Sequence, residues 1–212
     1  MTPFTPPPTS ADRAFWDQRY SEPDWAYGLE PNDFVREQSA GLPPGDALCL
    51  AEGQGRNAVF LASLGHRVIA QDLSQVGLDC ACRLAAARGV SLQTICGDLR
   101  DVIPQAESAD LVVAIWMHLP PELRRTVHRR AIAALRPGGH LLLEAYTPEQ
   151  LALGSGGPPR QELLMDPEVL RDELQGLEFK VFRCRQRWIE EGPYHHGTSA
   201  VVQVLGQKPA MP

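Results

Sequence analysis

The sequence predicts an α/β fold, a three-layer sandwich built around a mostly parallel seven-stranded sheet. From residue 46 onward, short apolar runs alternate with helix-like segments, which is typical of consecutive strand–helix–strand units. A glycine turn follows the first of these runs. After residue 177, two strand-like runs follow each other without a helix between them. Because such a pair closes as a hairpin, we expect one antiparallel strand near the C-terminus.

Each element has its own signal in the chain. The expected strands lie at 47–51, 67–71, 91–96, 109–116, 140–146, 178–188 and 198–205. The expected helices lie at 11–20, 33–40, 56–64, 74–88, 121–135 and 166–174. Ser10 is expected to cap the first helix, Gly65 and Gly89 to end two others, and Pro121 suits an opening turn.

The composition is typical of a single globular domain. The chain has 212 residues, of which 43% are hydrophobic and 22% charged, so it is long enough to bury one sizeable core. Residues 1–10 lack the basic and apolar regions of a signal peptide and are expected to form a flexible tail. No apolar run approaches the ~20 residues that span a bilayer, so no membrane partner is expected. The formal net charge of -6 makes nucleic acid an unexpected partner.

The five cysteines are odd in number and fit no zinc spacing, so we expect no metal site and a reducing, cytoplasmic location. Cys49 and Cys96 lie in apolar strand-like runs and are expected to be buried. Cys80 and Cys82 should point to different faces of one helix. A basic cluster, Arg124-Arg125 and Arg129-Arg130, has helical spacing and is expected to form a solvated helix face.

The most informative segment runs from Leu48 to Asn57 and is followed by an isolated acid, Asp72. It predicts a strand, a glycine turn, a helix and a second strand that ends in the Asp72 carboxylate. This arrangement holds an adenosine-type cofactor, because the backbone approaches closely at the glycines and the carboxylate accepts the ribose hydroxyls. Residues 53–58 also match the G-x-G-x-x-G/A pattern of nicotinamide-binding folds, which is a weak signal by itself. A purely structural role stays open, in which the glycines let a helix pack tightly on a strand.

Five segments occur in a fixed order between residues 46 and 146. They are Glu52-Gly53-Gln54-Gly55, Asp72-Leu73, Gly97-Asp98-Leu99, the run 110–116 and Leu135-Arg136-Pro137-Gly138-Gly139. In this order they resemble the motifs of the class I S-adenosylmethionine-dependent methyltransferases. The resemblance implies a Rossmann-like fold, S-adenosyl-L-methionine as the cofactor and S-adenosyl-L-homocysteine as the product.

The resemblance also implies roles for individual residues. It places at the cofactor Glu52, Gly53, Gly55, Arg56, Asn57, Asp72, Leu73, Asp98, Leu99 and Trp116. Asp72 is expected to accept the ribose hydroxyls in charge-assisted bonds, and Asp98 to accept from the adenine amino group. Leu73 and Leu99 would enclose the adenine ring. Trp116 follows the fourth motif strand, where the crevice of an open α/β sheet lies, and an ordinary core position is the alternative.

The glycine turn departs from the family pattern at two positions. Cys49 stands where the family usually has an acid, and Ala51 stands where it usually has a glycine. Glu52 is the adjacent acid and is expected to take over part of the missing role. The departure concerns the methionine end of the cofactor and leaves the predicted fold unchanged.

A narrower resemblance involves both ends of the chain. The segments 15–20, 27–34, 55–57, 146–150, 156–158 and 191–197 are similar to those of the tellurite-resistance methyltransferase group. In that group the N-terminal segment covers the cofactor, so the resemblance implies a lid formed by Trp16, Tyr20 and Tyr27. It also implies that Arg19 or Arg56 pairs with the methionine carboxylate, with a surface ion pair as the alternative.

The same resemblance divides the chain and suggests catalytic candidates. Residues 11–45 would form a helical lid, 46–147 the cofactor-binding core, and 148–212 an acceptor-side insert and C-terminal hairpin, all within one domain. His195 and His196 lie in the final hairpin loop, and His118 follows Trp116. Each histidine would orient the acceptor or take its proton, and a histidine without any role is the alternative.

These observations predict methyl transfer to a small-molecule acceptor, a soft nucleophile such as a sulfur, selenium or tellurium compound, by in-line displacement. The protein would be a monomer or a homodimer. Two alternatives from other classes stay open. One is a small NAD-dependent reductase, and the other is a non-catalytic protein that binds S-adenosylmethionine.

Overall fold

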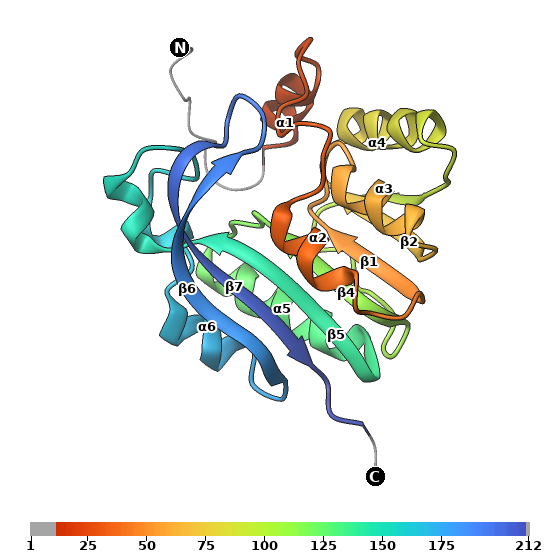
Figure 1. The fold of residues 1–212 in the computed structure, drawn as a ribbon, viewed down its shortest axis with the longest axis vertical. Helices are drawn as coiled ribbons and strands as arrows, with labels where there is room; N and C mark the ends of the chain where they lie inside the picture. Colours follow the sequence, from red (N-terminus) through yellow and green to blue (C-terminus); the bar gives the residue numbers. More distant parts are fainter. Residues whose placement is uncertain (1–11, 211–212) are drawn as a thin grey trace.

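Figure 1 shows the computed structural model, which describes residues 12–210. Its α-helices are α1 (Arg13–Tyr20), α2 (Asp33–Ser39), α3 (Arg56–Ser63), α4 (Gln75–Ala87), α5 (Pro121–Ala134) and α6 (Pro167–Glu173). Its strands are β1 (Asp46–Leu50), β2 (Arg67–Asp72), β3 (Gln93–Cys96), β4 (Ala109–Ile115), β5 (Leu135–Tyr146), β6 (Glu178–Glu190) and β7 (His196–Gln207). The tail predicted at 1–10 lies outside the described residues.

The described strands form one seven-stranded sheet in the order β3-β2-β1-β4-β5-β7-β6. β1 pairs in parallel with β2 and β4, and the pairs β2–β3 and β4–β5 are parallel as well. β7 lies antiparallel between β5 and β6, where the predicted hairpin closes the sheet. The predicted α/β class, with a mostly parallel sheet and an antiparallel strand near the C-terminus, is confirmed.

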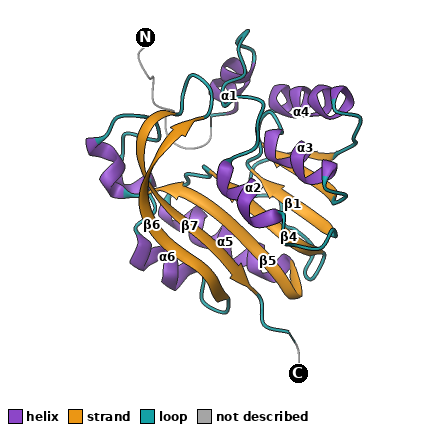
Figure 2. Cartoon of the chain, in the orientation of Figure 1, coloured by secondary structure: helices purple, strands orange, loops and turns teal. Residues whose placement is uncertain are grey.

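Helices cover both faces of the sheet, as Figure 2 shows. On one face α2, α3 and α4 pack against Ala47 and Cys49 of β1. On the other face α5 and α6 pack in the core that contains Leu48 and Leu50 of the same strand. Because neighbouring residues of a strand point to opposite faces, a strand covered on both sides is apolar throughout. The central strands are therefore continuous apolar runs in the sequence.

Several predicted boundaries differ from the observed ones. The N-cap of α1 is Asp12, whose carboxylate accepts from the N–H of Ala14 at 2.9 Å, and the predicted cap Ser10 lies outside the described residues. β5 begins at Leu135 and not at residue 140, because Leu135 already pairs with Ala109 before the register shifts. β7 begins at His196, earlier than predicted, because Glu190 of β6 pairs with it.

Two predictions about burial are wrong. Cys96 is exposed, because it lies on β3 at the uncovered edge of the sheet. Arg124 is only 4% exposed and pairs with Glu173 at 2.9 Å. The side chain of Arg124 is therefore not part of a solvated helix face. Cys80 is buried and Cys82 exposed, as predicted from their helical spacing. Within residues 12–210, none of the helices has the length and apolar character needed to cross a bilayer.

Gly55 ends the turn after β1 and stands immediately before α3. Its φ is 85°, and a Cβ placed on it would overlap the side chain of Ala81 in α4. The glycine therefore lets the chain bend and lets α3 lie close to α4. The structural interpretation of the glycine turn thus holds for Gly55, alongside the cofactor interpretation.

We expect Gly55→Ala to destabilise the protein more than Gly89→Ala. Gly89 also has a positive φ, 71°, but a Cβ there meets nothing within 4 Å. Gly89→Ala should cost about 1 kcal/mol through backbone strain, whereas Gly55→Ala adds about 1–3 kcal/mol through its overlap with Ala81. Urea unfolding measures both changes, and equal free energies of unfolding for the two variants would contradict this account.

Candidate active site

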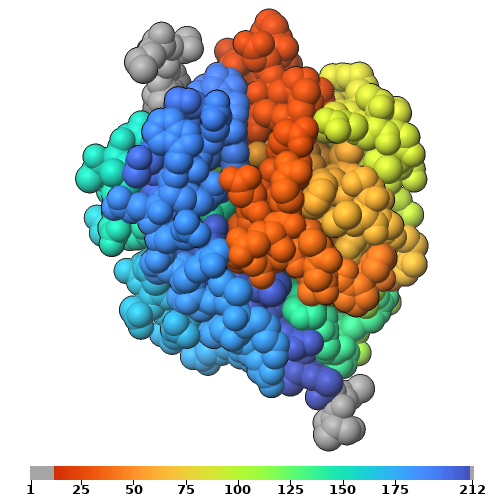
Figure 3. All heavy atoms as spheres, in the orientation of Figure 1, coloured from red at the N-terminus to blue at the C-terminus, as the bar shows by residue number. Residues whose placement is uncertain are grey.

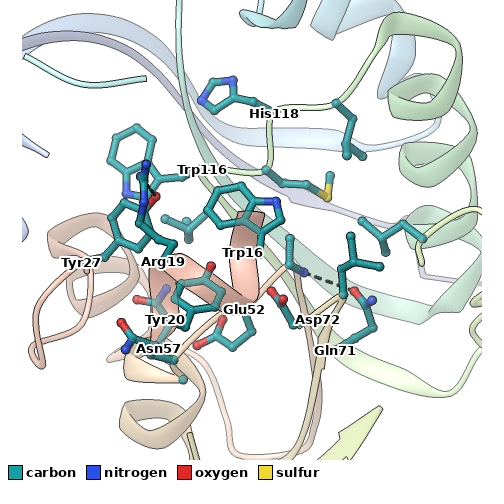
Figure 4. A pocket seen from close by; sticks show the side chains of 18 of the residues that line it. Trp16, Arg19, Tyr20, Tyr27, Glu52, Asn57, Gln71, Asp72, Trp116 and His118 are labelled. Carbon is teal, nitrogen blue, oxygen red and sulfur yellow. Dashed lines mark hydrogen bonds between the residues drawn. The ribbon is translucent and has the colours of Figure 1, made fainter. Parts of the chain in front are cut away.

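A cleft of about 1370 Å³, its open mouth included, is lined by residues that follow β1, β2, β3 and β4. The strand order reverses between β1 and β4, which is where an open α/β sheet binds its ligands. Figure 4 shows side chains that line the cleft, from α1, from the end of β2 and from the segments that follow β1 and β4. On the face shown in Figure 3, the segment 12–45 runs between the hairpin of β6 and β7 and the helices α3 and α4.

Asp72 ends β2 and closes the turn that follows β1. Its Oδ2 accepts from the N–H of Gly53 at 2.7 Å, and its Oδ1 accepts from the N–H of Ser74 at 2.8 Å. Burial raises the pKa of Asp72 to about 6, although these backbone N–H groups favour the ionised form. A carboxylate accepts about four hydrogen bonds, so each oxygen keeps capacity for a ligand hydroxyl. The glycine turn and the predicted ribose acid therefore form one unit.

Glu52 is a second carboxyl group of the cleft. Its Oε1 accepts from the N–H of Ala58 at 2.7 Å, and burial raises its pKa to about 7. A bound cation would stabilise the charged form of both Glu52 and Asp72. Cys49, at the family's usual acid position, is fully buried within the sheet and is not part of the cleft wall. Glu52, and not the residue at position 49, thus supplies a carboxyl group to the cleft wall beside the glycine turn.

Ala51 precedes Glu52 and has a φ of 50°. This left-handed conformation is unfavourable for residues other than glycine, because the Cβ approaches the following carbonyl oxygen. The backbone at this position would thus suit the glycine of the family pattern better than an alanine.

The end of the cleft beyond Asp72 is lined by Leu73, Gly97, Asp98 and Leu99. Leu99 is buried, and the Asp98 carboxylate accepts from the N–H and the guanidinium of Arg100 at 2.8 and 2.7 Å. The structure brings these residues together beside Asp72. Their individual contacts with an adenine ring stay a prediction.

The N-terminal segment covers the cleft with aromatic side chains. Trp16, Arg19, Tyr20 and Tyr27 all line it, and Trp16 stacks on Tyr20 with ring centroids 5.6 Å apart. A Cβ on Gly53 would lie 2.6 Å from the Tyr20 hydroxyl oxygen, so the lid packs directly on the glycine turn. Arg19 lies 3.7 Å from the centre of the Tyr194 ring and thus joins the lid to the final hairpin.

Arg56 and Asn57 line the cleft at the start of α3, and both have protein partners. The Nη2 of Arg56 donates to Oε2 of Glu191 at 2.5 Å, and its Nη1 donates to the carbonyl of Glu30 at 3.2 Å. The Oδ1 of Asn57 accepts from the N–H of Asn32 at 2.9 Å. The Arg56 charge is therefore neutralised by Glu191 within a buried pair rather than a surface one.

The candidate histidines have different surroundings. His195 is 5% exposed, lines the cleft and packs edge-on against Trp116 with ring centroids 5.0 Å apart. Its Nδ1 has no hydrogen-bond partner among residues 12–210, and burial lowers its pKa to about 3. His118 also lines the cleft, but its Nδ1 donates to the carbonyl of Leu163 at 2.9 Å and its Nε2 accepts from Tyr146 at 3.4 Å. Backbone groups thus hold both ring nitrogens of His118.

The prediction that places His196 at the site is wrong. His196 begins β7, is exposed, and packs against Trp188 outside the cleft. His195, in the turn before β7, is buried against the cleft, whereas the side chain of His196 is exposed, so the two histidines do not face the same space.

A buried group of polar residues beside the cleft was not predicted from the sequence. This ion cluster contains Asn32, Arg56, Glu144, Arg187, Glu191 and Gln203. Glu144 is fully buried and accepts from Arg187 at 2.8 Å and from Gln203 at 2.6 Å. One signal in the sequence pointed to it, because Glu144 interrupts the apolar run 141–146 and a buried carboxylate requires partners.

Residues 47–139 match the family model described as a methyltransferase domain. The chain is 32% identical over 141 residues to the tRNA 5-carboxymethoxyuridine methyltransferase of Escherichia coli (strain K12), an alignment that covers 58% of this chain and 52% of that protein. The chain therefore spans about half the length of the curated relatives that it matches.

Two solved structures show the same fold. TehB from Haemophilus influenzae has a TM-score of 0.71 and 18% identity, covering 84% of this chain and 62% of that one. NodS from Bradyrhizobium japonicum WM9, in complex with S-adenosyl-L-homocysteine, has a TM-score of 0.68 and 16% identity, covering 93% of this chain and 98% of that one. At these identities the likeness concerns the fold alone.

Residues 47–139 are a class I S-adenosylmethionine-dependent methyltransferase domain. S-adenosyl-L-methionine is the cofactor of this domain, and the carboxyl groups of Glu52 and Asp72 in the cleft suit its cationic sulfonium. The nicotinamide interpretation of residues 53–58, and with it the reductase alternative, is wrong. The lid and the final hairpin lie outside the matched range.

We expect the affinity of the methyltransferase domain for S-adenosylmethionine to increase with pH. The sulfonium and ammonium groups favour ionised carboxylates, but Glu52 and Asp72 have pKa values of about 7 and about 6 in the free protein. Binding at low pH must therefore release protons, and calorimetry should show roughly tenfold tighter binding at about pH 8 than at about pH 5.5. An affinity that does not change with pH would contradict these pKa values.

A matched pair of variants tests whether Glu52 causes this pH dependence. Glu52→Gln should reduce it, because the amide no longer titrates. Glu122→Gln removes an equivalent carboxylate whose side chain is 89% exposed on α5, and it should leave the pH dependence unchanged.

Proposed function

We propose that the protein transfers the methyl group of S-adenosylmethionine to a small, soft nucleophile, such as a sulfur, selenium or tellurium acceptor. One observation carries the proposal: the cleft has carboxylates for a cationic cofactor at one end and a mainly apolar wall at the other. That wall contains Trp116, His118, Pro158, Leu163 and His195.

The apolar wall supports a soft, weakly hydrated acceptor. Burial lowers the pKa of His118 to about 4 and of His195 to about 3, so both are neutral at physiological pH. Arg56 is neutralised by Glu191 and does not offer a free charge to an anion. A strongly hydrated oxyanion in contact with such a wall would lose hydrogen bonds to water that the protein does not fully replace, whereas a thiol would lose few of them.

The chain's residues would act mainly by positioning. The cofactor supplies a methyl group that is already activated on a sulfonium, so little proton transfer is needed. In our proposal Asp72 holds the ribose, Glu52 faces the cationic end, and Trp116 limits where the acceptor can lie. Aligning nucleophile, carbon and sulfur recovers up to ~7–11 kcal/mol of a reaction barrier. His195 is the group that would orient an acceptor proton, and His118 would fix the local backbone.

The segments outside the matched domain complete this proposal. Residues 11–45 would act as the lid, since Trp16, Tyr20 and Tyr27 line the cleft and Tyr20 lies against Gly53 of the glycine turn. Residues 148–212 would shape the acceptor side, to which Pro158 and His195 belong. Closure of such a site excludes water and favours the intended acceptor over side reactions.

Asp72→Asn is expected to weaken binding of S-adenosylhomocysteine by about 10–100-fold, because the charge-assisted bonds to the ribose are lost. Titration calorimetry measures the affinity. Asp79→Asn is the matched control, since Asp79 is exposed on the neighbouring helix α4. Thermal melting verifies that both variants are folded, and an unchanged affinity in folded Asp72→Asn would overturn the assignment of the cofactor site.

The acceptor class is tested with S-adenosylmethionine that carries a labelled methyl group. We expect label to appear on hydrogen sulfide or benzenethiol, and none on total tRNA. The tRNA arm is included because of the 32% identity to a tRNA methyltransferase, while the net charge of -6 disfavours a polyanion. Label on tRNA alone would replace the proposed acceptor. Cofactor binding without transfer to any of a chemically broad set of acceptors would favour the non-catalytic alternative.

A further inference from the structure

Glu191 connects three parts of the molecule through one buried carboxylate. It lies in the loop between β6 and β7 and is 6% exposed. Its Oε2 accepts from Arg56 at 2.5 Å and from the indole Nε1 of Trp116 at 2.7 Å. Its Oε1 accepts from Asn32 at 2.9 Å and from Arg187 at 3.2 Å. These partners come from three parts of the chain, namely the start of α3, the segment after β4 and the N-terminal segment, and from the hairpin of Glu191 itself.

Trp116 is the member of this group whose conformation most needs support. It follows β4 with a φ of 57°, which is rare for an aromatic residue and costs about 1–3 kcal/mol. Its N–H donates to the carbonyl of Glu144 at 2.9 Å, and its ring stacks on Tyr146 with centroids 4.4 Å apart. The bond to Glu191 then fixes the remaining rotation of the indole. The ring consequently forms a wall of the cleft in one orientation.

The ion cluster is poorly explained by stability. Buried ion pairs contribute little net stability, because removing both charges from water offsets their attraction. Burial alone would raise the pKa of Glu191, yet the Arg56 charge and the bonds from Arg56 and Trp116 hold it at about 2. Glu191 thus stays charged at every working pH. A permanently charged group in this position suits a geometric role.

We propose that Glu191 is a positioning residue for methyl transfer, which holds the Trp116 indole as the acceptor wall and ties it to the cofactor turn through Arg56. Glu191 does not itself line the cleft. It acts through Trp116 on the acceptor and through Arg56 on the turn that begins α3. This inference rests on the proposed function only for its turnover measurement, because the indole measurement is independent of any acceptor.

The first measurement follows the indole N–H signals by nuclear magnetic resonance in the full chain. The four tryptophans give four indole signals, and loss of one in Trp116→Phe assigns it. We expect the Trp116 indole N–H to exchange with solvent at least about tenfold more slowly than that of Trp188, because it is bonded to Glu191 and partly buried. Trp188 is the reference because it is 59% exposed.

Glu191→Gln and Glu190→Gln form the matched pair. Glu190 is the preceding residue and is exposed. We expect Glu191→Gln to shift the Trp116 indole signal and to speed its exchange about tenfold or more, while Glu190→Gln changes neither. An unchanged Trp116 signal in Glu191→Gln would overturn the proposal.

The second measurement separates an effect on acceptor turnover from an effect on cofactor binding, with benzenethiol as the probe acceptor. We expect Glu191→Gln to lower kcat/KM for benzenethiol by about 10–100-fold while S-adenosylhomocysteine affinity stays within about threefold. A parallel loss of both would overturn the proposal, because Glu191 would then only support the cofactor turn. Activity equal to that of Glu190→Gln would overturn it as well.

Two further controls keep the outcomes distinct. If Glu191→Gln does not fold, Glu191→Asp takes its place. This variant keeps the charge, but its side chain is one methylene too short to reach both Arg56 and Trp116. The same shift and faster exchange of the Trp116 indole signal are then expected, and an unchanged signal would overturn the proposal. If the wild-type protein does not methylate benzenethiol, the proposed acceptor class has failed its own test. The indole signal then supports or overturns the positioning role by itself.

Discussion

The hydrogen bond from the N–H of Gly53 to the carboxylate of Asp72 is the contact that organises the whole site. It joins the turn after β1 to the end of β2, two strands that run in parallel, so both chain segments arrive at the same edge of the sheet. Asp72 also receives the N–H of Ser74, the cap of α4. The acid that is predicted to bind ribose is thereby also the acid that shapes the glycine turn, so the predicted cofactor contact and the local fold depend on the same group.

The second constraint is the burial of charge beside the cleft. Among residues 12–210, the partners of the Glu144 carboxylate on the apolar strand β5 come from the N-terminal segment and the hairpin, namely Asn32, Arg187 and Gln203. These segments lie far apart in the sequence, yet the ion cluster requires all of them in place at once. The cluster thus joins the N-terminal segment to the hairpin of β6 and β7 and, through Glu191, to the indole of Trp116.

The core and the cofactor end were predictable because their signals are local. A central parallel strand is covered on both faces and must be apolar, as residues 47–50 of β1 are, and a glycine turn with an acid at the next strand end is typical of adenosine-binding sites. The failures have long-range causes. Cys96 was predicted to be buried, but the sheet ends at β3. Arg124 was predicted to be solvated, but α6 brings Glu173 to it. His196 was assigned to a loop, but pairing with Glu190 extends β7.

Periodicity, and residues a few positions apart, were enough to establish the α/β class, the order of the elements and the cofactor-binding motif. Three features of the site became known from the folded chain alone: Arg56 is paired with Glu191, His195 rather than His196 lines the cleft, and the Trp116 indole donates to Glu191. These features depend on which strand ends meet and which buried charges find partners. Such contacts join residues more than a hundred positions apart, as in the bond between Arg56 and Glu191, and no local pattern encodes them.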